Sequence, residues 1–391
     1  MSTGGYGSDL SFAFAHTPRI VFGAGAVSET GEQLGLLGCS KALIVTDSFL
    51  AEKTDMIARL EKALGPRLAG VFAGVVPDPT APSVDEGADF ARGKGADALI
   101  SLGGGSAIDT AKAMAVVLTE GGKLLDHEGY HNLKRRVTPH IAVPTTAGTG
   151  SEMTLVTVIT DPERGQKTYV GSYFLHPDVA VLDPELVVGL PPKLTAATGM
   201  DAMSHAVEAL ISSLRQPFSD AYALRAIEIT TEWLPRSLSE PGDLTARGQM
   251  LMAASMAGTA FSNAMVSLNH AMAHSLGAIY HAHHGTLNAI LLPYTMRFFN
   301  DVCAERFAMV ARAMGVDTSG MSESEAGFSA ADRMQDFIAQ VGLNERLADH
   351  GVDEDGLAKV AEMAVSDGAI IYSPKPVFDT DEIAGLLRQA L

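Results

Sequence analysis

The chain has 391 residues, of which 47% are hydrophobic and 19% are charged, as is typical of a globular protein large enough for two domains. Its formal net charge of −18 argues against nucleic acids and anionic membrane surfaces as partners, because both require a basic patch. No run of about 18 uncharged apolar residues predicts a membrane span, and the two distant cysteines, Cys39 and Cys303, suit the reducing cytoplasm.

The opening stretch MSTGGYGSDLSFAF has no basic start followed by a long apolar run, so we expect no signal peptide. From about Pro18 to Leu190, short β-rich runs alternate with helical segments. The strand-like runs include ALIVTDS, RLAGVFAGVV, ADALISLG, HIAVPTT and VAVLDPEL. Because such alternation is typical of a parallel sheet covered by helices, residues 1–190 are predicted to form an α/β domain.

The stretch VFGAGAVSETG imitates the start of a dinucleotide-binding fingerprint through Gly23 and Gly25. Its third glycine position holds Ser28, and no acidic residue follows about 20 residues later in the expected strand context. We therefore predict a structural turn into a helix here.

Asp47 stands at the end of the predicted strand ALIVTDS. A carboxylate in this position could accept hydrogen bonds from the adenosine ribose and would repel a 2′-phosphate, which favours NAD over NADP. The alternative is a helix N-cap formed by Asp47 or Ser48, and the sequence leaves both interpretations open.

Two glycine-containing segments follow predicted strands. In SLGGGSAIDTAK, Gly103, Gly104 and Gly105 precede a helix whose N-terminus could bind a pyrophosphate, although a tight turn without a ligand is the alternative. In VPTTAGTGSE, hydroxyl groups accompany Gly148 and Gly150, and this segment is either a cofactor contact or a surface turn. The hydroxyl-bearing residues are Thr145, Thr146, Thr149 and Ser151.

After GLPPKLTAATG, long Ala- and Met-rich stretches have helical spacing and few β-branched runs. Residues 191–391 are therefore predicted to form an all-helical domain, with Pro191 and Pro192 at its start. Within it, Asp201 and His205 are spaced i, i+4 on one helix. His270 and His274 have the same spacing on another helix, and His284 follows ten residues later. Carboxylate and imidazole groups in apolar surroundings suit Fe²⁺, Zn²⁺ or a similar ion, so this domain is predicted to bind a metal.

The whole chain resembles the iron-containing, or group III, alcohol dehydrogenase family, whose fold is shared with glycerol dehydrogenase and dehydroquinate synthase. The resemblance rests on TPRIVFGAGAV, LGGGSAIDTAK, VPTTAGTGSE, ITDPERGQK, GMDAMSHAVEA and NHAMAHSLGAIYHAHHGTLNAILLP in this order. It implies an N-terminal Rossmann-like dinucleotide-binding domain and a C-terminal all-α metal-binding domain, with the active site in a cleft between them.

Site residues are carried over from the family position by position. The metal ligands fall on Asp201, His205, His270 and His284, and His274 corresponds to a histidine beside the metal that is a candidate for proton transfer. His281 and His283 match no ligand. The NAD contacts fall on Asp47, Gly103, Gly104, Gly105, Ser106, Thr145, Thr146 and Thr149, with Lys167 near the cofactor ribose and Leu186 as an apolar neighbour.

The resemblance implies an NAD- and metal-dependent alcohol dehydrogenase, with Fe²⁺ as the expected ion and Zn²⁺ as the alternative. Apolar residues at Phe261 and Val156, our candidates for pocket walls, suit a small primary alcohol or short diol, whereas Lys375 could favour an anionic substrate. The alternatives are a hydroxyacid–oxoacid transhydrogenase with a retained cofactor, a dehydroquinate synthase-like lyase and a non-catalytic binding protein. We also expect a homodimer or larger homo-oligomer.

Two segments depart from the family pattern. Asp78 replaces a common Asn that contacts the cofactor, and an Asp cannot donate the hydrogen bonds of an amide. Near the C-terminus, Asp367 and Gly368 stand where many members have Asp-Cys, and the run that follows contains extra residues. Because this segment borders the substrate pocket in the family, substrate preference is the expectation that transfers least.

Overall fold

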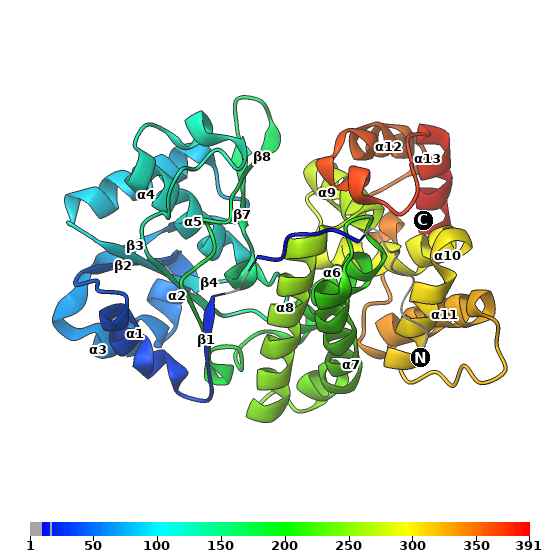
Figure 1. Ribbon diagram of the computed structural model, residues 1–391, viewed down its shortest axis with the longest axis horizontal. Helices are drawn as coiled ribbons and strands as arrows, with labels where there is room; N and C mark the ends of the chain where they lie inside the picture. The colour runs from blue at the N-terminus through cyan, green and yellow to red at the C-terminus, as the bar shows by residue number, and fades with distance from the viewer. Residues whose placement is uncertain (1–9, 16–17) are drawn as a thin grey trace. The chain divides into compact units, whose positions relative to one another are not determined.

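The computed structural model describes residues 10–15 and 18–391, so most of the stretch for which we expect no signal peptide lies outside the described residues. The chain forms two compact units, one α/β and one helical (Figure 1). We expected every residue up to 190 to belong to the α/β domain. Instead, the rings of Phe12 and Phe14 pack against Phe218 of the helical unit, so Leu10–Phe14 belong with that unit.

The α/β unit is built around a six-stranded sheet in which all neighbouring strands run parallel, in the order β1-β9-β6-β4-β2-β3. This sheet and the helices that cover it confirm the predicted fold class for this half of the chain. Its strands are β1 (Arg19–Phe22), β2 (Ala42–Asp47), β3 (Leu68–Val75), β4 (Ala98–Gly103), β6 (His140–Pro144) and β9 (Val179–Leu182). The helices are α1 (Thr30–Leu36), α2 (Ser48–Lys53), α3 (Met56–Leu64), α4 (Ala81–Gly93) and α5 (Gly105–Glu120).

The central strands are buried on both faces because helices cover both sides of the sheet (Figure 1). Successive side chains of β2 alternate between two cores. Leu43 and Val45 pack into the core formed with α4 and α5, whereas Ala42 and Ile44 pack into the core formed with α1 and α3. This two-sided burial explains the continuous apolar runs in the sequence.

The order in which successive strands are added to the sheet reverses between β2 and β4. From β2 the chain continues to β3 at one edge of the sheet, whereas from β4 it continues to β6 on the other side. Open parallel sheets bind ligands beyond the carboxyl ends of the strands at such a switch point. Asp47 ends β2 and Gly103 ends β4, so the two residues flank this position.

A second, three-stranded sheet of the α/β unit was not predicted. It contains β5 (Gly129–Tyr130), β7 (Val156–Asp161) and β8 (Gln166–Gly171), with β7 and β8 paired antiparallel. The tight turn between β7 and β8 is stabilised by Asp161, whose Oδ1 accepts hydrogen bonds from the N–H groups of Glu163 and Arg164 at 2.9 and 3.2 Å. Gly165 adopts a φ of 64°, which a glycine tolerates without strain.

The VFGAG segment is a structural turn, as the sequence predicts. Gly25 has a φ of 81° and precedes a short 3₁₀ helix at Ala26–Glu29 that leads into α1. Asp183 holds the turn, because its carboxylate accepts hydrogen bonds from the N–H groups of Gly25 and Val27, each at 3.1 Å.

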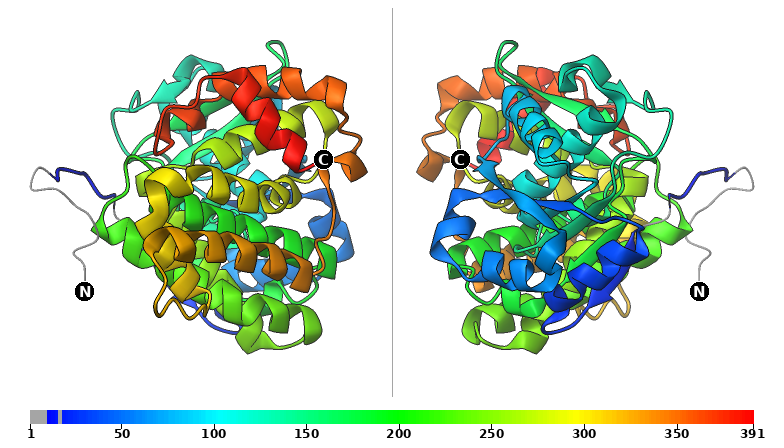
Figure 2. Two further views of the ribbon diagram at one scale, coloured as in Figure 1. Left: turned by 90° about the vertical axis from the view of Figure 1, so that its right-hand side faces the viewer. Right: turned by 90° about the vertical axis from the view of Figure 1, so that its left-hand side faces the viewer.

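The helical unit confirms the predicted all-α class of the second half. Its helices are α6 (Pro192–Ile211), α7 (Pro217–Ser239), α8 (Leu244–Ala264), α9 (Leu268–Tyr280), α10 (His284–Ala313), α11 (Glu323–Gln340), α12 (Leu357–Ser366) and α13 (Thr380–Gln389). Helix α10 runs alongside α11 (Figure 2, left view). Residues typical of helix N-termini mark the start of two of these helices. Pro192 occupies the first turn of α6, and Ser322 forms a capping box with Glu325 at α11.

Among the described residues, no single helix is long and apolar enough to cross a membrane. Helices α8 and α9 are long and apolar enough only when they are taken together as a pair. They are bent by 104° relative to each other.

Candidate active site

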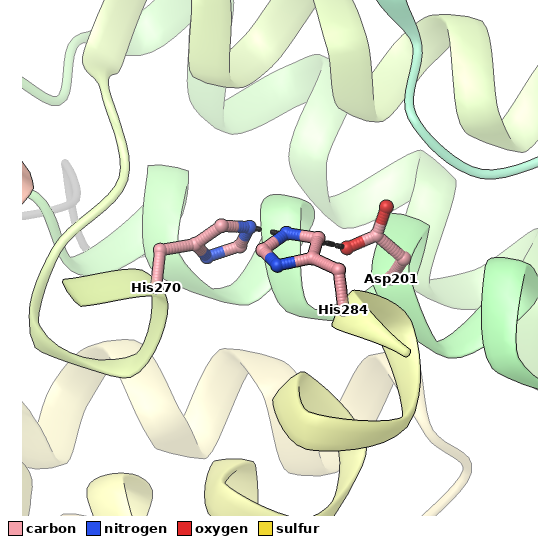
Figure 3. Close-up of side chains that lie close together, drawn as sticks. All are labelled: Asp201, His270 and His284. Carbon is pink, nitrogen blue, oxygen red and sulfur yellow. Dashed lines mark ion pairs between the residues drawn. The ribbon is translucent and has the colours of Figure 1, made fainter. Parts of the chain in front are cut away.

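Three helices of the helical unit bring predicted metal ligands together (Figure 3). Asp201 lies on α6, His270 on α9, and His284 is the first residue of α10. Their ligand atoms all lie within 4.8 Å of one another. Asp201 Oδ1 is 3.9 Å from His270 Nε2 and 3.5 Å from His284 Nε2. One carboxylate and two imidazoles therefore face a common point.

The fourth predicted ligand, His205, lies beside this group rather than within it. Its Nδ1 is 4.0 Å from Asp201 Oδ2, one helical turn away on α6. Its ring stacks on His270 with centroids 4.6 Å apart and on Phe261 with centroids 4.2 Å apart. Phe261, which we expected as a pocket wall, thus contacts a predicted ligand directly.

A glycine permits the close approach of α10 to α6. A Cβ placed on Gly285 would lie 2.3 Å from the backbone oxygen of Ala197 and 3.2 Å from Asp201 Cβ. Only a residue without a side chain fits this contact. The glycine after His284 therefore has a packing reason, and this packing directly affects the position of the predicted ligand His284.

The site is buried and electrostatically coupled. Asp201, His205 and His270 are buried, whereas the side chain of His284 is 40% exposed. Burial disfavours the charged carboxylate of Asp201, but the neighbouring imidazoles and a hydrogen bond outweigh this effect and lower its pKa to about 2. Asp201 is therefore ionised at neutral pH, as a metal ligand must be.

Two further buried residues, which were not predicted from the sequence, contact the predicted ligands. Glu208 faces His270, because its Oε2 is paired with His270 Nδ1. Asn288 Nδ2 is 2.9 Å from Asp201 Oδ1, 3.2 Å from His270 Nε2 and 3.0 Å from His284 Nε2. Spacing could have revealed both: Glu208 is seven residues after Asp201 on the same helix, and Asn288 is four residues after His284.

His274 lies beside the predicted ligands and has a carboxylate partner. Its Nδ1 is 2.9 Å from Asp367 Oδ2, and its ring stacks on that of His284 with centroids 5.3 Å apart. Burial would raise the pKa of Asp367, but the hydrogen bond and charge of His274 outweigh it and lower this pKa. No local sequence signal connects the two residues, which are 93 positions apart.

The remaining candidates of the helical unit have other surroundings. His281 and His283 are exposed, and His281 ends α9 with a left-handed φ of 55°. Lys375 does not present a free ammonium group. Its Nζ lies 2.9 Å from Asp301 Oδ2 and over the ring of Phe298. The expectation that Lys375 favours an anionic substrate is therefore not supported by its contacts.

Two of the predicted cofactor segments meet in the α/β unit, because β4 and β6 pair with Gly103 opposite Pro144. The N–H of Thr145 donates to the Gly103 carbonyl at 3.0 Å. A Cβ on Gly104 would lie 3.3 Å from Thr146, and one on Gly105 would lie 3.0 Å from Thr149. Glycines thus allow the two loops to pack closely at the carboxyl ends of adjacent strands.

Gly104 also occupies the N-cap position of α5 and, lacking a side chain, offers the helix no side-chain cap. Ser106 lies in the first turn of this helix, where N–H groups suit an anion such as a pyrophosphate. The turn therefore has the backbone features that a dinucleotide requires.

Three further cofactor candidates are engaged in protein contacts. Asp47 is the N-cap of α2 and accepts the Leu50 N–H at 2.9 Å, so the capping alternative is realised through one of its oxygens. Lys167 pairs with Asp78, the residue that departs from the family pattern. Leu186 is buried in the core formed with α1 and α3.

Comparisons with known proteins agree with this architecture. Residues 17–184 match the family model "Iron-containing alcohol dehydrogenase", and residues 195–391 match "Fe-containing alcohol dehydrogenase family, C-terminal". The chain is 38% identical to the NAD-dependent methanol dehydrogenase of Bacillus methanolicus over 96% of its length and 98% of the relative's.

Solved structures resemble the chain over nearly its whole length. A crystal structure of 1,3-propanediol oxidoreductase has a TM-score of 0.95 and 36% identity, covering 98% of this chain and 100% of that one. Sulfoacetaldehyde reductase from Bifidobacterium kashiwanohense, in complex with NAD⁺, has a TM-score of 0.88 and 30% identity, with 97% and 99% covered. The chain belongs to the iron-containing alcohol dehydrogenase family and is an oxidoreductase of its NAD-dependent alcohol dehydrogenase class.

Proposed function

We propose that Asp201, His205, His270 and His284 bind one divalent ion, Fe²⁺ in the cell, and that the enzyme interconverts a small primary alcohol or short diol with its carbonyl product. The observation that carries the proposal is the convergence of a carboxylate oxygen and two imidazole nitrogens from three helices. An oxygen and nitrogen donor set of this kind suits Fe²⁺ and also Zn²⁺.

The bound ion would supply Lewis-acid polarisation of the substrate oxygen, and NAD would supply the hydride acceptor. The protein residues contribute a negative charge, orient an imidazole ring and limit the access of water. The carboxyl group of Asp201 is ionised and contributes a negative charge, because its pKa is lowered. The aromatic face of Phe261 against His205 fixes the plane of that imidazole. Burial of Asp201, His205 and His270 limits the access of water to their donor atoms.

His274 is the proposed proton carrier. It is one helical turn after His270, and Asp367 Oδ2 holds its Nδ1 at 2.9 Å. A carboxylate at Nδ1 favours the tautomer with the proton on that nitrogen and leaves Nε2 able to accept another. The partly exposed imidazole, with 30% of its side chain accessible, can pass a proton outward to water.

For NAD, we propose contacts from the residues at the switch point of the large sheet. Gly103, Gly104, Gly105 and Ser106 would hold the pyrophosphate at the start of α5. Thr145, Thr146 and Thr149 lie in the loop that packs against these glycines. Asp47, at the end of the neighbouring strand, keeps one carboxylate oxygen outside its capping bond for the ribose hydroxyls.

Lys167 and Leu186 are proposed as further neighbours of the cofactor. The pair formed by Lys167 and Asp78 offers an explanation for the departure from Asn, because Asp78 holds the ammonium group in place. The second contact of Lys167 Nζ, 3.2 Å from Thr160 Oγ1, adds to this restraint. The burial of Leu186 supports an apolar packing role.

The proposed substrate is small and uncharged. Phe261 supplies an apolar surface beside His205, and the ammonium group of Lys375 is neutralised by Asp301. Two of the relatives are named for compounds of this class, methanol dehydrogenase and 1,3-propanediol oxidoreductase, whereas sulfoacetaldehyde reductase is named for an anionic aldehyde.

We also propose a homo-oligomer located in the cytoplasm. Strand β1 is at the edge of the large sheet, and its Ile20 and Phe22 are each 46% exposed, an apolar edge that a second copy could cover. The thiols of Cys39 and Cys303 are free, as a reducing compartment keeps them. Sedimentation analysis would test the assembly.

One set of assays tests the proposal. Chelator-treated protein is reconstituted with Fe²⁺ without oxygen, or with Zn²⁺, and assayed on methanol, ethanol and 1,3-propanediol with NAD and NADP. We expect metal- and NAD-dependent oxidation, and we expect His270→Ala to lose most bound metal and activity while remaining folded. His281→Gly removes an exposed imidazole and retains the left-handed helix end, so it should behave like the parent.

Stoichiometric metal binding by His270→Ala would contradict the ligand assignment. Turnover of a hydroxyacid with an oxoacid in the absence of added NAD would indicate a transhydrogenase instead.

A further inference from the structure

Glu208 is a fully engaged carboxylate in the interior of the helical unit, with only 1% of its surface exposed. Its Oε1 accepts hydrogen bonds from Ser267 N at 3.0 Å, Ser267 Oγ at 2.6 Å and Asn269 N at 3.0 Å. Its Oε2 is paired with His270 Nδ1. A charge in this position requires several donors, because burying it without partners would be strongly unfavourable.

These contacts tie the start of α9 to α6. The residue before α9, Ser267, makes no side-chain cap of its own, and the carboxylate of Glu208 takes over that role from the neighbouring helix. Helix α6 also carries Asp201, seven residues before Glu208. The same carboxylate therefore fixes both the backbone around His270 and the orientation of its ring relative to Asp201.

The hydrogen bonds also define the tautomer of His270. Since a carboxylate only accepts, Nδ1 carries the proton that faces Glu208. On the other side of the ring, Asn288 Nδ2 donates toward Nε2 at 3.2 Å. The orientation of this amide is set by Asn269, whose Nδ2 donates to Asn288 Oδ1 at 3.0 Å. Nε2 is thus the nitrogen with the lone pair, and it lies 3.9 Å from Asp201 Oδ1.

We propose that Glu208 is a positioning residue of the metal site, which holds His270 in the Nδ1–H tautomer and aims its Nε2 lone pair at the point shared with Asp201 and His284. The inference rests on the proposed function, since it assumes that these residues bind a metal. Hydrogen-bonded partners of metal-bound imidazoles orient the ring and increase its basicity, and their loss typically weakens metal binding by about 10- to 100-fold.

The test measures Zn²⁺ affinity rather than activity. Parent, Glu208→Gln and Glu232→Gln proteins are titrated with Zn²⁺ in competition with a chromogenic chelator, and their folding is compared by circular dichroism. Glu232 is an exposed glutamate on α7 and provides the matched control. We expect an affinity about 10- to 100-fold weaker for Glu208→Gln and parent-like affinity for Glu232→Gln.

Parent-like affinity in a folded Glu208→Gln protein would overturn the inference and leave the proposed metal site intact. A parent protein that binds neither Zn²⁺ nor Fe²⁺ would instead refute the proposed metal site itself. In case Glu208→Gln does not fold, ¹⁵N spectra of histidine-labelled, Zn²⁺-loaded parent decide independently. A protonated Nδ1 with a Zn²⁺-bound Nε2 in His270 supports the inference, and the reverse arrangement overturns it.

Discussion

His274 Nδ1 lies 2.9 Å from Asp367 Oδ2, so the C-terminal residues that follow α12 contribute a carboxylate to the neighbourhood of the predicted metal ligands. Asp367 is held in turn, because its Oδ1 accepts the N–H of Ala369 at 2.8 Å. The arrangement fixes the ring of His274 and gives it a different carboxylate partner from that of the predicted ligand His270, whose Nδ1 faces Glu208.

Replacing His274 should therefore separate proton transfer from metal binding. We expect His274→Ala to retain its metal and to lower kcat by about 10²- to 10⁴-fold, the usual contribution of a general acid or base. Asp367→Asn should lower kcat less, because the amide still occupies the same space. Metal content by mass spectrometry and the pH profile of kcat check the prediction, with His281→Gly as control.

Loss of metal in parallel with activity would make His274 a ligand. A parent-like kcat and pH profile would make it a packing residue.

Asp47 combines a structural and a proposed recognition role, and two substitutions can separate them. Asp47→Ser should keep the cap of α2 and remove the negative charge, so the preference for NAD over NADP should narrow without loss of stability. Asp47→Gly should narrow the preference for NAD over NADP equally. It should lower the stability by only a few tenths of a kcal/mol, because glycine is a slightly poorer N-cap. The ratio of kcat/KM values for the two cofactors is the measurement, and an unchanged ratio in both variants would show that Asp47 only caps the helix.

Lys112 is a buried ammonium group that joins α5 to β7. Its Nζ donates to Thr154 O at 2.9 Å and to Val156 O at 3.0 Å, while the charges of Asp109 and Glu152 partly offset the effect of burial. Lys112→Met should destabilise the protein by about 3–5 kcal/mol, because it leaves buried acidic groups uncompensated. Urea unfolding at pH 7 is the measurement, and Lys62→Met on the exposed side of α3 should change stability little.

The same lysine gives a pH dependence with a defined sign. Burial lowers the pKa of Lys112 from its ordinary value of 10.5 to about 8. Between these values the unfolded chain binds more protons than the folded one, so this group adds stability as the pH rises through the window. The parent should therefore gain unfolding free energy relative to Lys112→Met between pH 8 and 10.5, and parallel curves would contradict the lowered pKa.

Periodic patterns predicted the larger features of the fold. The continuous apolar runs of β2 and β4 indicated strands buried on both faces, and the i, i+4 spacing of Asp201 with His205 indicated one helical face. The small sheet of β5, β7 and β8 was missed, because β7 alternates between buried and half-buried residues and is joined to β8 by a polar turn. Short strands of this kind have little signal in a single sequence.

The polar partners of the site depended on longer-range contacts. The pairing of His274 with Asp367 spans 93 positions, and the exposure of His274 cannot be read from its neighbours in sequence. Lys375 shows the converse: a cation expected to be available to substrate is bound by Asp301 on α10, 74 residues away. Spacing identifies which side chains share a helix face, but the tertiary fold decides which of them meet.

Gly285 provides a final test, because it links helix packing to ligand position. A Cβ at this residue would lie 2.3 Å from Ala197 O and 2.9 Å from Ala197 C on α6, so Gly285→Ala must push the first turn of α10 outward. His284, at the start of that turn, would move away from Asp201 Oδ1, which is now 3.5 Å from its Nε2. We expect a loss of about 1–3 kcal/mol in unfolding free energy from overpacking, together with weaker Zn²⁺ binding.

Gly385→Ala on α13 is the matched control, because nothing lies within 4 Å of its added Cβ. That variant should gain about 0.5–1 kcal/mol from helix propensity and bind Zn²⁺ like the parent. Parent-like stability and affinity in Gly285→Ala would show that α10 and α6 can separate without displacing the ligand.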